Sequence, residues 1–283
     1  MMKLKLTTLI EDNIDDAKKL INEHGLSLYI EVDGKNILFD TGQTGDFIKN
    51  AKSLNKNLGC IDYIIISHGH YDHSGGFRKL INELNNKVEV IVGAEFFNKK
   101  YKLLDVQTYK YIGNSFDENY ILEKCIPLKK IEDNVHYISE NLMLFHHFER
   151  KTDFEIRNDK FFIDDENVKI HDEFEDEIVL GISTKKGLVV VVGCSHVGII
   201  NILNSIKEKT GMPIYAVIGG THLVEANEIR MKKTIEELHK FNLSLIGVSH
   251  CTGEEGIKRI KEEFEDTYIY NNTGNVIEID DEA

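Results

Sequence analysis

One short stretch of the chain concentrates side chains that bind metal ions. Residues 68–73 read His-Gly-His-Tyr-Asp-His, with three histidines and one carboxylate, directly after the apolar run 64–66. Imidazole and carboxylate groups together suit zinc, and they also suit manganese or iron. A polar loop whose histidines only cap backbone groups would not need this His-x-His-x-Asp-His frame. We therefore interpret the stretch as a metal site.

The spacing within this loop favours two neighbouring metal positions. His68 and His70 are two residues apart, so both side chains can point to one side of an extended loop. Asp72 and His73 are adjacent and their side chains diverge, so they fit that same position poorly. Two metal positions therefore agree with the spacing better than one.

Composition limits the partners of the chain. Its 283 residues carry a formal net charge of −14, which argues against a nucleic-acid backbone or an anionic membrane surface as the main partner. We expect no signal peptide and no membrane span. The four cysteines are widely separated without a Cys-x-x-Cys pair, which is typical of free thiols in a reducing compartment. We expect a cytoplasmic protein that acts on a small molecule, for which a local pocket for one phosphate is compatible with the charge.

Strand and helix patterns alternate on both sides of the metal loop. In the first third, we expect strands at 4–10, 27–32, 36–39, 63–67 and 88–92, and helices at 47–54 and 76–84. In the last third, we expect three strands, each followed by a helix: 187–192 and 197–209, 214–218 and 226–241, 243–248 and 254–264. Such units form parallel strands, and ligands gather at the carboxyl ends of these strands.

Each of these last three strands ends in a small residue followed by a histidine. The histidines are His196, His222 and His250, and the strand before His68 ends in the same way. We expect these four loops to meet at one edge of the core. Residues 97–176 differ, because they are rich in Tyr, Phe, Asn and charge and have weak periodicity. We expect short edge strands and long loops there, which form a variable cover over the site.

Five segments of the chain resemble a known family. They are 23–27 (EHGLS), 38–42 (LFDTG), the metal loop, 193–199 (GCSHVGI) and 249–253 (SHCTG). Together they resemble metallo-β-lactamase-fold hydrolases, and within these a subgroup of metal-dependent hydrolases that includes the dihydropterin aminobenzene ribofuranosyl-phosphate synthases of the methanopterin pathway. The resemblance implies an α/β fold, a four-layer αβ/βα sandwich. It also implies a single domain over residues 1–283, with the site at one edge.

The resemblance also implies a ligand set. His68 and His70 would hold the first metal ion, and Asp72 and His73 the second. His250 stands at the position of the last histidine ligand of the superfamily.

The strand-end Cys194 departs from the superfamily pattern. Many members have an aspartate there that bridges the two metals. Either Cys194 supplies a thiolate instead or His196 takes over the ligand role, and we favour His196 as the additional histidine of the first site. His146 and His147 match no motif of the family, and as loop histidines they are more simply exposed groups than ligands.

Other polar residues are candidates for supporting roles. Asp40 ends a strand, and in the resemblance it lies beneath the metal loop, where it can accept the second N–H of a ligand histidine. The alternative for Asp40 is a turn-forming aspartate in Asp-Thr-Gly. His222, His24 and Ser27 are candidate substrate contacts, although His24 and Ser27 can equally be a capping pair at a strand start. Asp176 matches an acidic segment of the family, without a role that the sequence defines.

The favoured function is a metal-dependent hydrolase. It would use two divalent ions, zinc first and manganese or iron as alternatives, to activate water against an ester, phosphoester or lactone-like substrate. Asp72 and His73 are the candidate catalytic residues. The alternatives are a transferase like the pterin synthases, an iron redox enzyme with Cys194 as a soft ligand, and a non-enzymatic metal-binding sensor.

Overall fold

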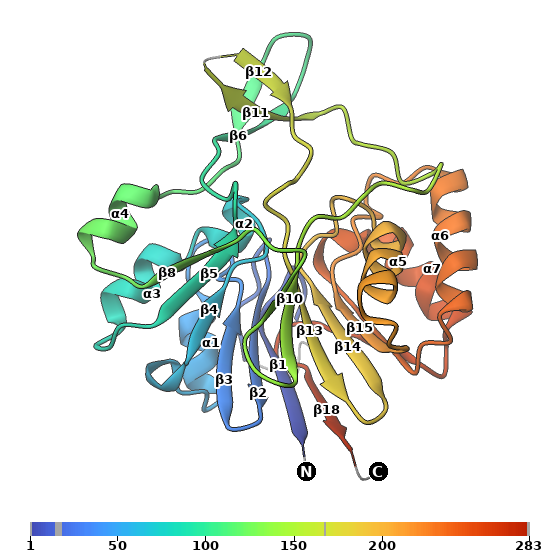
Figure 1. The fold of residues 1–283 in the computed structure, drawn as a ribbon, viewed down its shortest axis with the longest axis horizontal. Coiled ribbons are helices and arrows are strands. Elements are labelled where there is room, and N and C mark those ends of the chain that lie inside the picture. The colour runs from blue at the N-terminus through green and yellow to red at the C-terminus, as the bar shows by residue number, and fades with distance from the viewer. Residues whose placement is uncertain (1, 15–18, 167, 282–283) are drawn as a thin grey trace.

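Two seven-stranded sheets pack against each other, with helices on both outer sides (Figure 1). The structure is a computed structural model, and it describes residues 2–14, 19–166 and 168–281. The layers run helix, sheet, sheet, helix, which confirms the predicted four-layer αβ/βα sandwich of the α/β class. Among the described residues, no helix combines the length and the apolar character needed to cross a membrane.

The first sheet has the strand order β18-β1-β2-β3-β4-β5-β8. Its strands are β1 (Lys3–Ile10), β2 (Ser27–Val32), β3 (Lys35–Phe39), β4 (Tyr63–Ile65), β5 (Glu89–Gly93), β8 (Leu128–Ile131) and β18 (Val276–Asp280). The strands from β18 to β3 pair antiparallel, and those from β3 to β8 pair parallel. On this half lie α1 (Phe47–Ser53), the short helix η1 (Leu58–Cys60), α2 (Tyr71–Ser74), α3 (Phe77–Glu83) and α4 (Glu118–Glu123).

The second sheet has the order β17-β16-β15-β14-β13-β10-β9. Its strands are β9 (Val135–Tyr137), β10 (Leu142–Phe145), β13 (Val179–Thr184), β14 (Gly187–Val192), β15 (Ile214–Gly219), β16 (Leu245–Val248) and β17 (Tyr268–Tyr270). Strands β14 to β17 pair parallel. On this half lie α5 (Ile199–Thr210), α6 (Glu228–Lys240), the short helix η2 (His250–Thr252) and α7 (Gly253–Glu263).

The valine run of β14 explains how the layers hold together. Val189 and Val191 pack between the two sheets, whereas Val190 and Val192 pack against the helices of the second half. All four side chains are fully buried. Because side chains alternate along a strand, a continuous apolar run is what a strand covered on both faces requires.

The middle region is only in part the cover that we expected from the sequence. Strand β8 forms the edge of the first sheet, and β10 lies inside the second sheet with all four of its residues buried. The expectation of edge strands and loops was therefore wrong for β10. Its Leu-Met-Leu-Phe run is too short to show a period, so its place in the core depends on pairing with β13 and β9.

A small antiparallel sheet stands above the site edge of the sandwich (Figure 1, top). It has the order β12-β11-β6-β7, and we call it the ribbon. Its strands are β6 (Lys100–Leu103), β7 (Tyr109–Tyr111), β11 (Phe161–Asp165) and β12 (Val168–His171). The ribbon therefore draws on two segments that lie about fifty residues apart in the chain.

Hydrogen exchange should separate the two parts of the middle region. We expect the amides of β10 to exchange as slowly as those of β14, because β10 is buried and paired on both sides. The amides of β7 should exchange faster, because every residue of that edge strand is exposed. Equal protection of β7 and β10 in a mass-spectrometric time course would contradict this division.

Candidate metal centre and active-site cavity

Loops from both sheets meet at one edge of the sandwich. β4 leads into the loop with His68 and His70, β14 leads into the loop with Cys194 and His196, and β16 leads into η2 with His250. Parallel strands place their carboxyl ends at the same edge, which is why these loops converge.

Gly193 allows the two halves to approach each other closely. A Cβ atom at Gly193 would lie 2.1 Å from the Ser67 hydroxyl oxygen on the opposite loop. No side chain larger than hydrogen fits at that distance.

One group of side chains consists of His68, His70 and His196. His68 Nε2 lies 3.1 Å from His70 Nδ1, and the His196 ring centroid lies 4.9 Å from that of His68 and 4.7 Å from that of His70. Within the described chain, the Nε2 atoms of His70 and His196 are buried without a hydrogen-bond partner. Buried polar nitrogens almost always have a partner, so this arrangement fits a metal ion.

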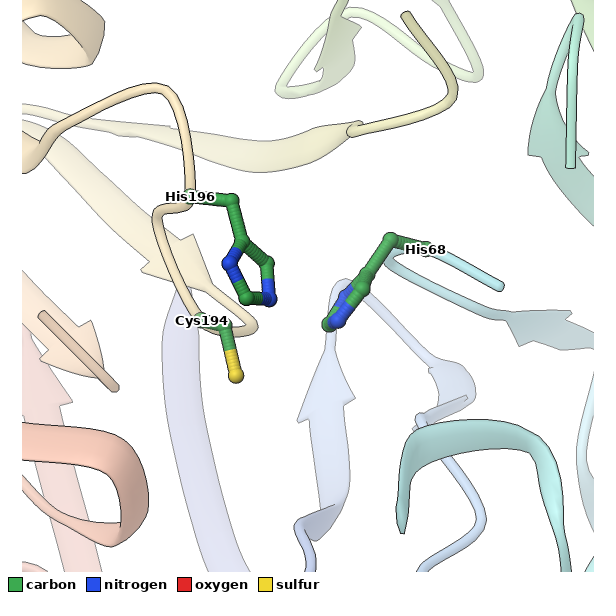
Figure 2. A group of neighbouring side chains, drawn as sticks. All are labelled: His68, Cys194 and His196. Carbon is green, nitrogen blue, oxygen red and sulfur yellow. The ribbon is translucent and has the colours of Figure 1, made fainter. Parts of the chain in front are cut away.

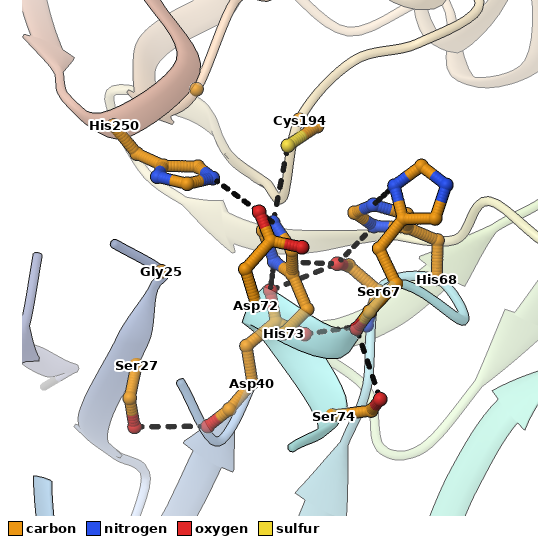
Figure 3. Close-up of polar contacts among 12 residues, drawn as sticks. Gly25, Ser27, Asp40, Ser67, His68, Asp72, His73, Ser74, Cys194 and His250 are labelled. Carbon is orange, nitrogen blue, oxygen red and sulfur yellow. Dashed lines mark hydrogen bonds and ion pairs between the residues drawn. The ribbon is translucent and has the colours of Figure 1, made fainter. Parts of the chain in front are cut away.

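A second group consists of Asp72, His73 and His250 (Figure 3). Asp72 Oδ2 lies 3.3 Å from His250 Nε2 and 3.9 Å from His73 Nε2. Asp72 and His73 thus lie beside His250, while His68 and His70 lie beside His196.

Cys194 belongs to both groups. Its sulfur lies 3.1 Å from His73 Nε2, and its side chain points into the space below His68 and His196 (Figure 2). The ligand atoms of His68, Cys194 and His196 lie within 4.8 Å of one another, and so do those of His73, Cys194 and His250. The sequence left Cys194 and His196 as alternatives, and the fold brings both to the site.

The electrostatic environment differs between the two groups. Burial, together with the crowding of several histidines that cannot all carry a charge, lowers the pKa of His68, His70 and His196 well below the usual value. These imidazoles are therefore neutral, which is the form that binds metals. Burial raises the pKa of the Cys194 thiol well above its usual value, so a thiolate there requires a neighbouring cation.

Contacts with carboxylates dominate in the second group. Burial opposes ionisation of Asp72, but His73 and the contacts with His24 and His250 lower the pKa of its carboxyl well below the usual range. Burial also opposes charge on His250, yet its contacts with Asp12 and Asp72 raise its pKa. The second group therefore pairs an ionised carboxylate with a histidine that favours its protonated form, and a bound metal ion would displace that proton.

Asp40 lies beneath the metal loop and contacts it three times. Its carboxylate accepts hydrogen bonds from the Ser67 backbone N–H at 2.7 Å and from the Ser67 hydroxyl at 2.8 Å. Asp40 Oδ2 also lies 2.6 Å from His73 Nδ1. When His73 donates its Nδ1 proton to Asp40, its Nε2 lone pair is left to face Asp72 and Cys194.

Other buried carboxylates hold the remaining loops. Glu177 accepts from the backbone N–H groups of His196 and Val197 at 2.9 and 3.0 Å. Glu11 accepts from the backbone N–H of His250 at 2.6 Å, and Asp12 Oδ1 lies 2.7 Å from His250 Nδ1. Burial raises the pKa of Glu11 and of Glu177 to about 7.

Asp176 connects the metal loop to the ribbon. It accepts from the Gly69 backbone N–H at 2.7 Å and from Lys100 Nζ at 2.8 Å, and Asp172 accepts from the same lysine at 2.6 Å. Lys100 is buried, so it makes this connection away from solvent.

No pattern in the sequence indicated a role for Glu11, Asp12 or Glu177 at the site. The available signal was an acidic pair that directly follows the apolar strand β1, and a second acidic pair just before β13. A carboxylate directly after a buried strand is positioned to accept loop N–H groups. The sequence did not show which loops these carboxylates would contact.

His24 and Ser27 have different environments. His24 Nε2 lies 3.3 Å from Asp72 Oδ2, and its Nδ1 lies 3.0 Å from Asp12 Oδ2, at the rim of the cavity. Ser27 is fully buried, and its hydroxyl donates to the Asp40 carbonyl oxygen at 2.9 Å. The fold thus places Ser27 under the site rather than on the cavity wall.

Three other histidines that the sequence singled out also differ in whether they line the cavity. His222 lines the cavity, with its ring centroid 4.3 Å from that of His196. His146 and His147 instead bond to backbone oxygens: His146 to that of Glu175 at 2.5 Å and His147 to that of Glu132 at 3.0 Å. They fix a loop and do not belong to the cavity lining.

A cavity of about 580 Å³ opens between the metal-type residues and the ribbon. His70, Asp72, Cys194, His196 and His250 of the two groups line its floor, and β6, β7 and β11 of the ribbon form the opposite wall. A cavity of this size is suited to a small molecule.

Comparison with known proteins identifies the family. The model of the metallo-β-lactamase superfamily matches residues 21–200, which is more than half of the chain. The chain therefore belongs to this superfamily, as the five sequence segments suggested.

Three of the similar proteins extend over nearly the whole chain. The 7,8-dihydropterin-6-methyl-4-(β-D-ribofuranosyl)-aminobenzene-5'-phosphate synthase of Methanocaldococcus jannaschii is 33% identical over 297 aligned residues, covering 97% of this chain and 96% of that protein. A crystal structure of a metal-dependent hydrolase of the β-lactamase superfamily has a TM-score of 0.84 at 30% identity and covers 98% of this chain and 99% of its own. A diphosphatase of the PhnP family has a TM-score of 0.55 at 12% identity over 99% of this chain and 98% of its own, a likeness of fold alone.

Replacing Asp40 by asparagine should weaken metal binding without unfolding the protein. The amide keeps one oxygen for the Ser67 backbone, but it cannot accept from both Ser67 Oγ and His73 Nδ1. We expect metal affinity to fall about 10- to 100-fold, as for other partners of ligand histidines.

Competition with a chelating dye measures this affinity. Asp33→Asn, in the exposed turn after β2, is the matched control and should bind metal like the unmodified protein. An unchanged affinity in Asp40→Asn would show that Asp40 only shapes the turn.

Proposed function

We propose that the protein is a metal-dependent hydrolase with two divalent ions. His68, His70 and His196 would hold the first ion, and Asp72, His73 and His250 the second, with Cys194 between them. The observation that carries the proposal is the two buried groups of ligand-type atoms around Cys194, with histidine nitrogens that lack hydrogen-bond partners. Zinc suits this histidine, cysteine and carboxylate set best, and manganese or iron are alternatives.

When bound, the ion pair would supply an activated water and a Lewis acid at neutral pH. Asp72 is ionised and reaches the cavity, so it can accept the proton that the attacking water loses and deliver it to the leaving oxygen. His73, held by Asp40, keeps one orientation throughout. The reaction consumes one water: an ester or phosphoester gives an acid and an alcohol, and a lactone opens to a single hydroxy acid.

The substrate would be a small molecule held between the centre and the ribbon. His24 and His222 line the cavity on different sides of the centre and are the proposed substrate contacts. His24 is held in place by Asp12, which keeps its other ring nitrogen directed at Asp72. All four cysteines are free thiols, which supports a cytoplasmic location.

A transferase is the second candidate function. It is favoured by the near full-length similarity to the synthase of Methanocaldococcus jannaschii. A transferase would use the same centre but exclude water, and its cavity would hold two substrates at once. An iron redox enzyme would show a coloured thiolate–iron centre, and a sensor would show no turnover at all.

A panel of generic esters, phosphodiesters and lactones tests the hydrolase against its alternatives. The metal-loaded protein should turn over at least one class, and chelation should abolish that turnover while added zinc or manganese restores it. Turnover that survives complete metal removal, or none with any class, would count against the hydrolase.

Single substitutions should separate the two metal positions. His68→Ala should lower the metal content by about one ion per chain, because it removes a ligand of the first group. Asp72→Asn should keep the first ion and lose turnover. His239→Ala, in an exposed position on α6, is the control for both. Elemental analysis that gives equal metal content in all variants would contradict the assignment.

Cys194 should be protected from alkylation by bound metal. A coordinated thiolate reacts slowly, so iodoacetamide should label Cys194 faster after chelation than before. The exposed Cys60 and Cys125 serve as internal controls, because their labelling rates should not depend on metal. Peptide mass spectrometry follows each site, and a Cys194 rate that is independent of metal would remove this residue from the ligand set.

A further inference from the structure

The ribbon presents two lysines to the cavity. Lys102 of β6 is directly opposite Lys110 of β7, and Phe161 of β11 is directly opposite Lys102. Directly opposite residues project from the same face of a sheet, so these three side chains share one face. All three line the cavity above the metal-type residues.

This pairing of lysines is unfavourable without a negative group between them. Like charges directly opposite each other in a sheet repel. Lys102 is compensated by Glu225, whose carboxylate lies 3.0 Å from its Nζ. Among the described residues, no carboxylate lies within ion-pair distance of Lys110, and its Nζ lies 5.8 Å from the centroid of the Tyr71 ring. Lys110 is exposed and belongs to the cavity lining, so its ammonium group can turn to an anion without breaking an ion pair.

His222 is a further polar residue of the cavity lining, on the side of the metal-type residues. It is about nine-tenths buried, and neither ring nitrogen has a hydrogen-bond partner among the described residues. Its Nε2 lies 3.8 Å from Glu225 Oε2, within ion-pair distance but too far for a hydrogen bond. A buried imidazole that lines a cavity and makes no hydrogen bond can direct a ring nitrogen to a ligand.

The carboxylates that line the same cavity do not neutralise the positive charge of these residues. Glu225 is engaged by Lys102, and Asp12 is engaged by His24 and His250. Asp72 is engaged by His24 and His250 in the second group, and Glu254 is the remaining acidic residue of the lining. The chain as a whole carries −14, so an anionic molecule needs local cations to be held here.

We propose that Lys102, Lys110 and His222 form an anion-binding subsite of the cavity. The proposal rests on the hydrolase function and names its substrate class: a small compound with a phosphate or carboxylate group at the end remote from the scissile bond. Tyr71, Ile112 and Phe161 line the cavity between these residues and would contact an apolar or aromatic body.

Binding of simple aromatic anions to the metal-loaded protein tests the subsite. Isothermal titration with phenyl phosphate, phenylacetate and neutral benzyl alcohol compares anions with a neutral molecule of similar size. Lys110→Gln should weaken binding of at least one of the anions by about fivefold or more, the loss expected for one charge-assisted contact, and leave benzyl alcohol unchanged. The anion that responds to Lys110 shows whether the group is a phosphate or a carboxylate.

The matched control is Lys160→Gln, which removes the same charge at an exposed position outside the cavity lining. It should bind like the unmodified protein, and Lys110→Arg should restore binding. Equal anion affinity in Lys110→Gln and Lys160→Gln, or no anion binding by the unmodified protein, would overturn the subsite. Because the titration needs no turnover, failure of the hydrolase assays counts against the proposed function alone.

Discussion

Asp40 lies fully buried at the end of β3, and its carboxylate holds both ends of the loop that carries the first four ligand-type residues. A buried carboxylate is costly unless each oxygen has hydrogen-bond partners, and here Ser67 and His73 provide them. The same contacts orient His73 and fix the chain just before His68. The geometry of the centre therefore depends on this one contact between the first strands and the metal loop.

Buried carboxylates hold the other loops of the site in the same way. Glu11, Asp176 and Glu177 each accept a backbone N–H from a loop that carries a ligand-type histidine. Loops that extend beyond the ends of strands have unpaired N–H groups, which must find acceptors when they are buried. Some acidic residues of this negatively charged chain are thus buried, where they stabilise the loops of the site.

The centre combines two electrostatic environments side by side. Around His196, burial keeps the imidazoles neutral, whereas around Asp72 contacts with histidines keep a carboxylate charged. Cys194 lies at the boundary between these environments, at the end of a strand whose residues are buried on both faces.

The ribbon covers both groups of the centre, and its buried Lys100 connects it to the metal loop through Asp176. A change in the ribbon can thus reach the centre through two hydrogen bonds.

The sequence by itself determined the strands and helices with clear periodicity and the motif-bearing loops. These features are local, because a strand pattern and a histidine two residues from another histidine are visible within ten residues. The four-layer class of the fold followed instead from the resemblance of five segments to a known family. The sequence could not show that β10 belongs to the core, since its four apolar residues have no readable period.

Only the tertiary structure decided which residues meet. Cys194 and His196 both reach the centre because β14 ends between the two groups, and Ser27 lies below the cavity because β2 pairs with β3, next to Asp40. Lys102 and Lys110 share a face because of the register between β6 and β7, which depends on strand pairing rather than on composition. Contacts between residues far apart in the chain follow from packing, and no local pattern encodes them.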